Sequence, residues 1–283
     1  MPAPATRLRQ LLDGPDMVVA PFVFDAFQAR IAQAAGFEAV YMTGFGTAAS
    51  RGFPDVGLLT MAEMVQNVRY IASAIELPLI CDADTGYGNP VNVYRTVREY
   101  EAAGAAALHI EDQVWPKRCG FLAGKQVIPM DDMVPKVRAA CDARRSDDFV
   151  IIARTDALAV NGWEDVITRG RAYREAGADL IFVDGIRTLA DMERYAKELG
   201  DLPLLYNGQL LPVQEIQKFG FRLTIYSATL MAAYIRMRDA MQELKTTGRI
   251  ATDAGWGCFE EMTNLLGVPE AMEIGKKYEG DAE

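Results

Sequence analysis

The sequence predicts an α/β fold of the TIM type, a (β/α)8 barrel followed by extra C-terminal helices. Apolar segments of strand length recur along the 283 residues and alternate with segments of helical periodicity. Most of these apolar segments are continuous, which is typical of parallel strands covered on both faces. Repeated β then α units of this size and number fit one closed barrel.

The expected strands are short apolar runs, most of them continuous. They are Met17–Phe22, Ala39–Thr43, Leu77–Cys81, Ala106–Ile110, Phe149–Ala153, Leu180–Val183, Leu202–Tyr206 and Leu223–Tyr226. Three of the joints that precede a strand share an Ala-Gly pair, at 35–36, 103–104 and 176–177. A glycine at that point can end a helix in the left-handed conformation, so each joint predicts a helix-to-strand turn.

The expected helices lie between these strands, and two of them have clear starting signals. Thr60 can cap a helix with Glu63 three residues later, and Asn89 precedes Pro90 at a first helical position. The expected helices are Asp25–Ala35, Met61–Ile75, Pro90–Ala103, Asp131–Arg145, Trp163–Ala176, Leu189–Leu199, Val213–Phe219 and Leu230–Lys245.

The alternative arrangement is a doubly wound open sheet. It is disfavoured because no Gly-x-Gly-x-x-Gly sequence follows the first expected strand. After Gly248 the pattern changes, and Trp256–Leu266 and Pro269–Tyr278 are expected as helices beyond those that a barrel needs. We therefore predict a catalytic barrel domain over residues 1–248 and a helical extension over residues 249–283.

Composition and charge exclude several classes of protein. The chain is 50% hydrophobic and 24% charged, which is ordinary for a globular protein. It has a net charge of −10, which disfavours nucleic acid and acidic membrane surfaces as partners. No signal peptide and no apolar run long enough to span a membrane is recognisable. Its four cysteines are far apart in the sequence, so we expect reduced thiols in a cytoplasmic protein.

Acidic residues follow several expected strands, at the end where a (β/α)8 barrel carries its chemistry. Asp82 and Asp84 follow the third strand and Glu111 follows the fourth, with Asp55 in a nearby loop. Such carboxylates repel one another unless a cation neutralises them, and an oxygen-only set favours Mg²⁺ or Mn²⁺. A single aspartate here could equally cap a helix, but the set favours a metal site. His109, the only histidine, is expected to be a hydrogen-bonded packing residue.

The second informative segment is Trp-Pro-Lys-Arg-Cys-Gly-Phe at 115–121, which places a cysteine between basic residues and a glycine. Cationic neighbours lower the pKa of a thiol and suit it to proton transfer. We therefore expect Cys119 to lie on a mobile, positively charged loop with Lys117. A core position is expected instead for Cys81 and Cys141.

Five motifs together resemble one known family over nearly the whole chain. They are Tyr-Met-Thr-Gly at 41–44, Asp-Ala-Asp-Thr-Gly-Tyr-Gly at 82–88, His-Ile-Glu-Asp-Gln at 109–113, Lys-Arg-Cys-Gly at 117–120 and Ala-Arg-Thr-Asp-Ala at 153–157. In this order they resemble the isocitrate lyase and phosphoenolpyruvate mutase superfamily. The Lys-Arg-Cys-Gly motif resembles its carbon–carbon lyase branch, which includes methylisocitrate lyase and 2,3-dimethylmalate lyase. The resemblance implies a barrel whose last helix is swapped between subunits of a homotetramer, a dimer of dimers.

The resemblance also implies roles for individual residues. Mg²⁺ would lie near Asp82, Thr43 would help to bind a substrate carboxylate, and Cys119 would protonate a departing carbanion. Tyr41 or a metal-linked carboxylate would act as the base, with Arg154 as a further anchor. The predicted catalytic residues are Cys119, Tyr41, Arg154 and Lys117, the substrate-binding residues are Thr43, Gly44, Phe45, Gly120, Phe121, Asp184 and Asn207, and the metal ligands are Asp55, Asp82, Asp84 and Glu111.

Four positions depart from the pattern of this family. Phe121 stands where relatives have His, Phe45 where they have Gly or Ala, and Asp184 where they have Glu. The sequence Gly-Gln-Leu-Leu at 208–211 follows Asn207, where relatives carry Glu and Thr/Ser-Pro, so Gln209 is also unusual. We expect a more apolar or differently shaped substrate end that suits neither isocitrate nor methylisocitrate. The alternative is that the two phenylalanines only pack the closed loop.

The predicted function is a Mg²⁺-dependent carbon–carbon lyase whose partner is a small carboxylic acid. It would cleave a 2-hydroxy (di)carboxylic acid, a substituted malate or methylisocitrate-like compound, to a 2-oxo acid such as pyruvate or glyoxylate plus a carboxylic acid. The enzymatic alternatives are hydrolysis or decarboxylation of oxaloacetate and phosphonate chemistry, and Cys119 argues against the last two. A barrel that binds a metabolite without catalysis is the alternative from another class.

Overall fold

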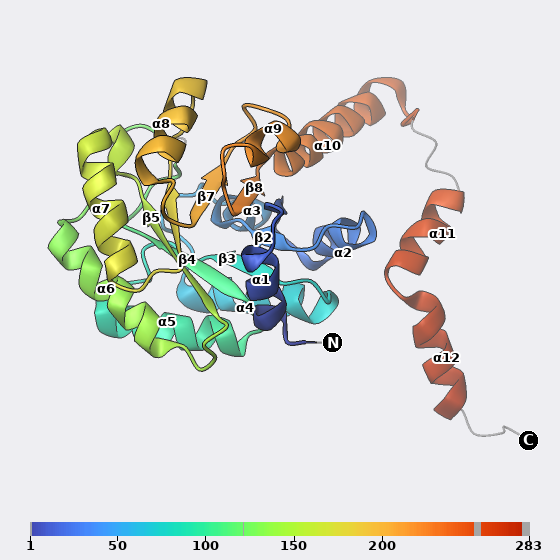
Figure 1. Ribbon diagram of the computed structural model, residues 1–283. Helices are drawn as coiled ribbons and strands as arrows, with labels where there is room; N and C mark the ends of the chain where they lie inside the picture. The colour runs from blue at the N-terminus through green and yellow to red at the C-terminus, as the bar shows by residue number, and fades with distance from the viewer. Residues whose placement is uncertain (1, 121, 252–255, 279–283) are drawn as a thin grey trace, which may run out of the picture.

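The protein is a closed barrel of parallel strands in the computed structural model, which describes residues 2–120, 122–251 and 256–278 (Figure 1). The strands follow one another around the barrel in chain order, and β1 pairs with β8 to close it. They are β1 Val18–Val23, β2 Val40–Met42, β3 Leu79–Asp82, β4 Ala107–Glu111, β5 Val150–Thr155, β6 Leu180–Val183, β7 Leu204–Asn207 and β8 Leu223–Tyr226. The predicted (β/α)8 fold class is confirmed.

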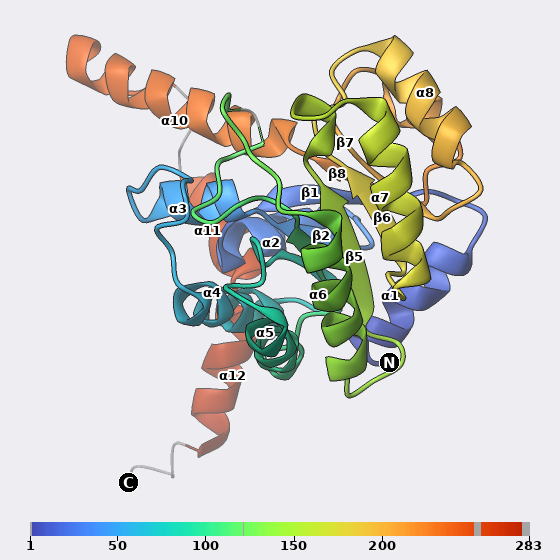
Figure 2. The same ribbon diagram turned by 90° about the vertical axis from the view of Figure 1, so that its left-hand side faces the viewer.

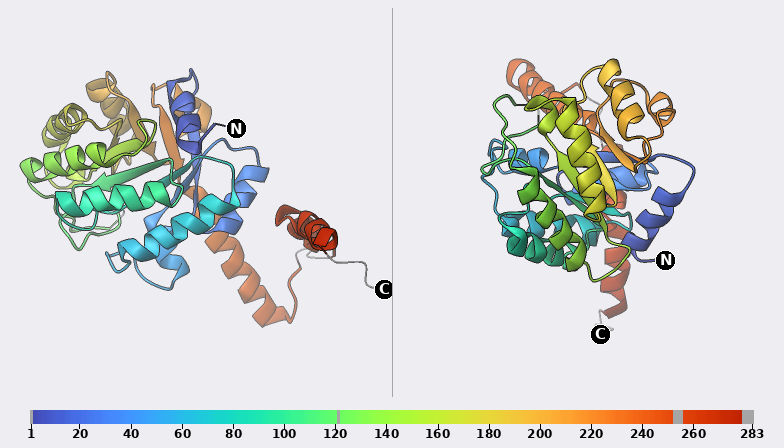
Figure 3. Two further views of the ribbon diagram at one scale, coloured as in Figure 1. Left: turned by 90° about the horizontal axis from the view of Figure 1, so that it is seen from below. Right: turned by 60° about the vertical axis from the view of Figure 1, so that its left-hand side comes forward.

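Helices cover the outside of this barrel, and Figure 3 shows them arranged around the strands. They are α2 Ala26–Ala34, α4 Met61–Ala74, α5 Pro90–Ala102, α6 Met130–Ala143, α7 Trp163–Glu175, α8 Leu189–Leu199 and α9 Val213–Gln217, with a 3-10 turn, η1, at Ala157–Ala159. Helix α10 (Ala228–Thr247) follows β8 and extends away from the barrel (Figure 1). The predicted caps are present, because Thr60 and Glu63 form a reciprocal capping box before α4 and Asn89 caps α5.

Two helices have no counterpart among the expected elements. Helix α1 (Pro4–Asp13) buries Leu8 and Leu12 against the residues that fill the barrel interior. Helix α3 (Gly44–Ser50) begins directly after β2, where the Thr43 side chain accepts a hydrogen bond from an amide of the first turn. Helix α1 has leucines on one face, at positions 8, 11 and 12, but it precedes the first strand and so lies outside the alternating pattern of strands and helices, whereas α3 is only seven residues long.

The strands supply two separate apolar layers because successive side chains point to opposite faces. One layer lies between the strands and the helices, and the other fills the barrel. Ile80, Ala107 and Ile152 belong to the inner layer, so the residues two positions further along their strands also face inward. At the carboxyl ends of the strands, these inward positions are occupied by polar residues, namely Asp82, His109, Glu111, Arg154, Asp184 and Asn207.

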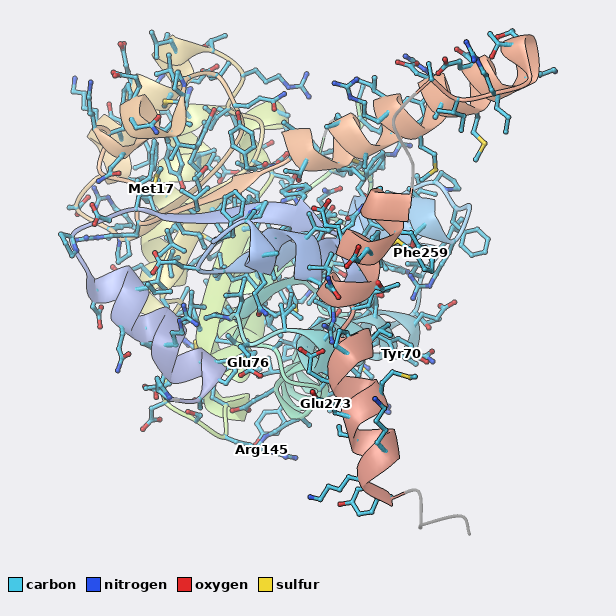
Figure 4. The ribbon with its side chains drawn as sticks, turned by 90° about the vertical axis from the view of Figure 1, so that its right-hand side faces the viewer. Met17, Tyr70, Glu76, Arg145, Phe259 and Glu273 are labelled. Atoms are coloured by element: carbon cyan, nitrogen blue, oxygen red, sulfur yellow. The ribbon has the colours of Figure 1, made fainter. Side chains whose placement is uncertain are left out.

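The last part of the chain forms an arm beside the barrel, made of α10, α11 (Trp256–Leu265) and α12 (Val268–Tyr278). Figure 1 shows α11 and α12 standing apart from the ring of helices, and Figure 4 labels Phe259 and Glu273 on them. The arm touches the barrel where the Arg30 guanidinium donates to the Leu265 carbonyl at 3.0 Å. None of the described helices combines the length and the apolar character needed to cross a membrane.

Candidate active site

Two carboxylates at one side of the barrel mouth hold a buried ammonium group. Lys117, in the loop after β4, lies 2.6 Å from Asp55 Oδ1 and 2.8 Å from Asp84 Oδ1. Burial opposes the charge on Lys117, but Asp84 and Asp82 outweigh it and raise the pKa of this amine well above its usual value. Burial raises the pKa of Asp84 to about 6, despite the opposite effect of Lys117. The site therefore attracts a cation strongly.

Asp82 lies at the end of β3 and accepts hydrogen bonds from two backbone amides. The Gly44 amide donates to Oδ2 and the Asp84 amide donates to Oδ1, both at 3.0 Å. Burial opposes ionisation of Asp82, but His109, Lys117 and Arg154 outweigh it and lower its pKa to about 2. A side chain at Gly44 would place Cβ 2.5 Å from Asp82 Oδ2, so this close approach requires glycine.

An aromatic hydroxyl and an imidazole lie beside Asp82 inside the barrel. The Tyr41 hydroxyl is 2.7 Å from His109 Nε2, and this nitrogen is 3.5 Å from Asp82 Oδ1. Burial lowers the pKa of His109 to about 4, so its imidazole is neutral at neutral pH. Burial and then Asp82 raise the pKa of Tyr41 well above its usual value, so its hydroxyl retains its proton. His109 is hydrogen-bonded as expected, but it lies within the site and not in an apolar layer.

Arg154 is surrounded by carboxylates at the end of β5. Its guanidinium makes two hydrogen bonds to Asp156, at 2.9 and 3.0 Å, and lies 3.1 Å from Glu111 Oε2 and 3.5 Å from Asp184 Oδ2. It also lies over the ring of Phe182, 5.1 Å from its centroid. This environment fixes the direction of the guanidinium in the barrel mouth.

Glu111 is the least satisfied carboxylate of this group. It is fully buried, and neither of its oxygens has a hydrogen-bond partner, although one lies in the ion pair with Arg154. Burial raises the pKa of Glu111 well above its usual value, an effect that Arg154 opposes. A buried carboxylate with open acceptor positions is suited to receive a cation or a hydrogen-bond donor from a bound molecule.

The Cys119 loop, of which residues 113–120 and 122–126 are described, crosses the mouth of the barrel on the side of α3 (Figure 2). The Cys119 amide donates to the Asp55 carbonyl at 3.1 Å, and the side chain is only 8% exposed. We expected Cys119 on a positively charged loop with Lys117, but the Lys117 charge does not stand free beside the thiol. The charge of Lys117 is neutralised by two carboxylates, and Arg118 donates outward to the Ala123 carbonyl at 2.9 Å.

Sequence reasoning missed Lys125, which lies at the end of the Cys119 loop. Its ammonium is 2.8 Å from Asp156 Oδ1 and 3.0 Å from Asp184 Oδ2. It missed Asp112 in the same way; this carboxylate accepts from Thr155, Arg169 and Tyr173 behind the site. No local pattern marks these residues, since each acquires its partners through chain closure over more than 30 positions.

The other predicted substrate-binding residues differ in how available they are to a bound molecule. Thr43 and Gly44 lie at the start of α3, but Thr43 Oγ1 and the Gly44 amide already bond within the chain. Phe45 is 37% exposed at the mouth, and Asn207 Oδ1 is buried without a hydrogen-bond partner. Phe121 lies outside the described residues.

The residues expected to bind a metal have suitable chemistry. Asp55, Asp82, Asp84 and Glu111 are all buried and offer only oxygen ligands, which suit Mg²⁺. Among the residues that the structure describes, no three acidic, histidine or cysteine side chains are close enough to hold a metal as they stand. The Lys117 ammonium lies between two of the predicted ligands, at 2.6 and 2.8 Å, so a cation is already accommodated there. The donor set and the unsatisfied Glu111 fit a divalent ion.

Comparison with known proteins agrees with this arrangement. The phosphoenolpyruvate phosphomutase family matches residues 8–245. The 2,3-dimethylmalate lyase of Eubacterium barkeri is 42% identical, with 97% of this chain and 98% of the relative covered. The 2-methylisocitrate lyase of Aeropyrum pernix is 41% identical, with 84% of this chain and 78% of the relative covered.

A solved structure is also similar over almost its full length. The structure of oxaloacetate acetylhydrolase with the inhibitor 3,3-difluorooxalacetate has a TM-score of 0.92 and 39% identity, and 99% of each chain is covered. A closed barrel, a cysteine loop and buried acidic residues are thus accompanied by matches over nearly the whole chain. The chain belongs to the phosphoenolpyruvate mutase/isocitrate lyase superfamily.

Proposed function

We propose that this protein is a carbon–carbon lyase that cleaves a 2-hydroxy dicarboxylic acid to a 2-oxo acid and a carboxylic acid. Substituted malates are the preferred substrate class, and methylisocitrate-like acids are the second. The observation that carries the proposal is the convergence of Cys119, Arg154 and the acidic cluster around Asp82 at one barrel mouth. The lyase relatives named above support the same reaction class.

We assign Mg²⁺ as the cofactor, with Mn²⁺ as a substitute, and Asp55, Asp82, Asp84 and Glu111 as the residues that hold it. When bound there, the ion supplies positive charge that lowers the pKa of a substrate hydroxyl. Lys117 neutralises two of these carboxylates in the structure, so it must give way when the ion binds. Its role in the proposal is to hold the acidic cluster together before binding.

In the proposed reaction, the substrate 2-hydroxyl loses its proton and carbon 2 becomes the carbonyl carbon of the 2-oxo acid. The bonding pair between carbons 2 and 3 moves to carbon 3, beside the second carboxylate. The Cys119 thiol donates its proton to carbon 3, and solvent restores that proton after the products leave. Arg154 stabilises the charge of the intermediate, and the closed loop excludes water from it.

The base that accepts the hydroxyl proton is better supplied by a carboxylate than by Tyr41. Burial raises the pKa of Tyr41, so its hydroxyl is a weak acceptor at neutral pH. Among the carboxylates of the acidic cluster, Asp84 suits this role better than Asp82, because burial raises the pKa of Asp84 to about 6 whereas the pKa of Asp82 is lowered to about 2. The Tyr41 hydroxyl lies 3.5 Å from Asp82 Oδ2 and is hydrogen-bonded to His109.

Substrate selection is proposed to depend on Phe45, Asp184 and Gln209, and on Phe121, which lies outside the described residues. Asp184 is held by Lys125 at 3.0 Å and by Arg154 at 3.5 Å, so its short carboxylate faces inward and is unavailable to a substrate hydroxyl. Phe45 adds an exposed aromatic ring at the entrance. We therefore expect poor use of isocitrate and methylisocitrate compared with alkyl-substituted malates.

We further propose a cytoplasmic homotetramer, a dimer of dimers, in which residues 249–283 form a swapped extension of the barrel domain 1–248. The C-terminal arm exposes a series of large apolar side chains, and a second copy of the chain would cover them. They are Met231, Tyr234, Ile235, Met237, Met241, Leu244, Phe259, Met262, Leu266, Met272 and Ile274. The cytoplasmic location is proposed from the wide spacing of the four cysteines in the sequence.

A substrate panel tests the proposal directly. Purified protein with Mg²⁺ is incubated with 2,3-dimethylmalate, 2-methylmalate, methylisocitrate, isocitrate and oxaloacetate, and 2-oxo acid products are quantified. We expect a 2-oxo acid from the substituted malates, loss of turnover with a chelator, and restoration by Mg²⁺. Oxalate from oxaloacetate, without cleavage of any hydroxy acid, would instead assign the activity of the structurally similar acetylhydrolase. Tight ligand binding without any turnover would assign a non-catalytic barrel.

A further inference from the structure

Lys125 is a buried lysine that connects three parts of the barrel mouth. It lies five residues after Gly120 in the Cys119 loop and donates to the Gly120 carbonyl at 3.0 Å. The same ammonium donates to Asp156 Oδ1 at 2.8 Å and to Asp184 Oδ2 at 3.0 Å. We call this set of contacts, made by Lys125 with Gly120, Asp156 and Asp184, the Lys125 bridge.

The two carboxylates of the Lys125 bridge are also partners of Arg154. Asp156 receives two hydrogen bonds from the guanidinium, and Asp184 lies 3.5 Å from it. Burial opposes the charge on Lys125, but Asp184 and Asp156 outweigh it and raise its pKa, so the amine is charged at neutral pH. Displacing Lys125 would therefore alter the charge around Arg154 as well as the loop.

The backbone of the Cys119 loop at Gly120 lies in close contact with Asp184 and Arg154. A Cβ atom on Gly120 would lie 2.4 Å from Asp184 Oδ2 and 2.8 Å from Arg154 Nη2. Gly120 is therefore pressed onto Asp184 and Arg154 when the loop is closed. Cys119, the preceding residue, is fixed by the same contact and by its amide hydrogen bond to Asp55.

Closure leaves little space at the acidic side of the site. The cavity beside Gly44, Asp55 and Asp84 is about 10 Å³, which is the space of one water molecule. Cys119 is only 8% exposed in the closed loop, so a molecule reaches the thiol only when the Cys119 loop moves. The residues that control this closed position therefore control the approach of the thiol.

We propose that Lys125 is a positioning residue that holds the Cys119 loop closed and aligns Cys119 with Arg154 at the same time. The ammonium ties the loop backbone at Gly120 to the two carboxylates that orient Arg154. Both reacting groups then reach their places through one set of contacts. The catalytic roles of Cys119 and Arg154 in this inference rest on the proposed function, whereas the closure itself does not.

Lysine is suited to this task because its ammonium can donate to three acceptors that lie in different directions. Methionine keeps the apolar stem and a similar volume but removes the charge and the donors. In Lys125→Met, the Gly120 carbonyl would lose its ammonium donor, and the carboxylates of Asp156 and Asp184 would share Arg154 alone. The closed loop then loses its ionic attachment while its apolar packing remains.

The test measures how easily a reagent reaches Cys119. Wild type, Lys125→Met, Lys125→Arg and the exposed control Lys197→Met are treated with iodoacetamide without substrate, and labelling is followed for each cysteine peptide by mass spectrometry. Cys258 is exposed and serves as an internal reference for the reagent. We expect Cys119 to react at least about tenfold faster in Lys125→Met, with Lys125→Arg between this variant and wild type and Lys197→Met unchanged.

A Cys119 labelling rate in Lys125→Met within twofold of wild type, at an unchanged melting temperature, would overturn the proposal. If Lys125→Met does not fold, Asp184→Asn removes a partner from the other side of the bridge and must accelerate Cys119 labelling in its place. On an active substrate, we expect a lower kcat with a smaller change in KM, since alignment and not binding is impaired. Faster labelling in a protein that cleaves no substrate would keep Lys125 as the closing residue and reject the proposed function.

Discussion

The buried ion pair between Arg154 and Asp156 provides the sharpest test of how the site is held together. Both side chains are buried, and the Asp156 carboxylate receives two hydrogen bonds from Arg154 and one from Lys125. Asp156→Asn keeps the shape of the side chain but removes its charge. Two cations are then left in a poorly solvated environment with less compensation.

The expected cost is large because Arg154 and Lys125 then share only Glu111 and Asp184 to balance two buried positive charges. Such losses are typically about 3–5 kcal/mol, and in a protein of this size that lowers the melting temperature by roughly 6–10 °C. The pKa of Asp156 points in the same direction, since Arg154 and Lys125 outweigh the effect of burial and lower it. Urea-induced unfolding at pH 7.5, followed by circular dichroism, measures the free energy of unfolding.

The chain contains a matched control on its surface. Arg171 and Asp201 form a pair of similar geometry, with contacts of 2.8 and 3.2 Å, but their side chains are 46% and 60% exposed. Solvent screens this pair, so Asp201→Asn is expected to change stability by no more than the scatter of the assay. Equal losses in Asp156→Asn and Asp201→Asn would refute the argument that burial makes the Asp156 contact important.

Three further changes have defined outcomes. Gly120→Ala would displace the closed loop by about 1 Å, so we expect roughly a 100-fold loss of kcat/KM with little change in melting temperature. The control is Ala123→Ser, at an exposed position of the same loop, whose kcat/KM should stay near that of wild type. Cys119→Ser should abolish cleavage of the best malate substrate while Mg²⁺ binding, measured by calorimetry, is retained, and an unchanged rate would remove the thiol from the mechanism. The pKa of His109 is about 4 in the folded protein and 6.5 when the side chain is exposed, so the unfolded state binds the proton first as pH falls. The free energy of unfolding of wild type should therefore fall by about 3 kcal/mol relative to that of His109→Gln between pH 6.5 and 4. Equal pH dependence of unfolding in the two proteins would contradict a buried neutral His109.

The fold could be predicted well because its signals are local. Continuous apolar runs separated by capped helices repeat along the chain, and the strands and helices that surround the barrel lie close to their predicted positions. Helices α1 and α3 were not predicted. Leu8 and Leu12 stabilise α1 only once a barrel interior exists to receive them, and α3 depends on its cap and on burial of its glycines.

The candidate site also contains residues that the sequence could identify and residues that it could not. Asp82, Glu111, Arg154 and Asp184 could be found from sequence because each follows an apolar strand whose alternation turns it inward at the barrel mouth. Lys125 could not be found, because it follows a loop with no strand or helix to fix its direction.

The sequence by itself determined which residues form strands, which end of each strand bears polar groups and which family the chain resembles. Only the tertiary structure decided the ionic partners, since it pairs Lys117 with Asp55 and Asp84, and Lys125 with Asp156 and Asp184. The physical reason is the distance along the chain over which each interaction acts. Side-chain periodicity and helix caps act over a few residues, whereas these charges meet only after the closed barrel brings distant segments together and removes them from water.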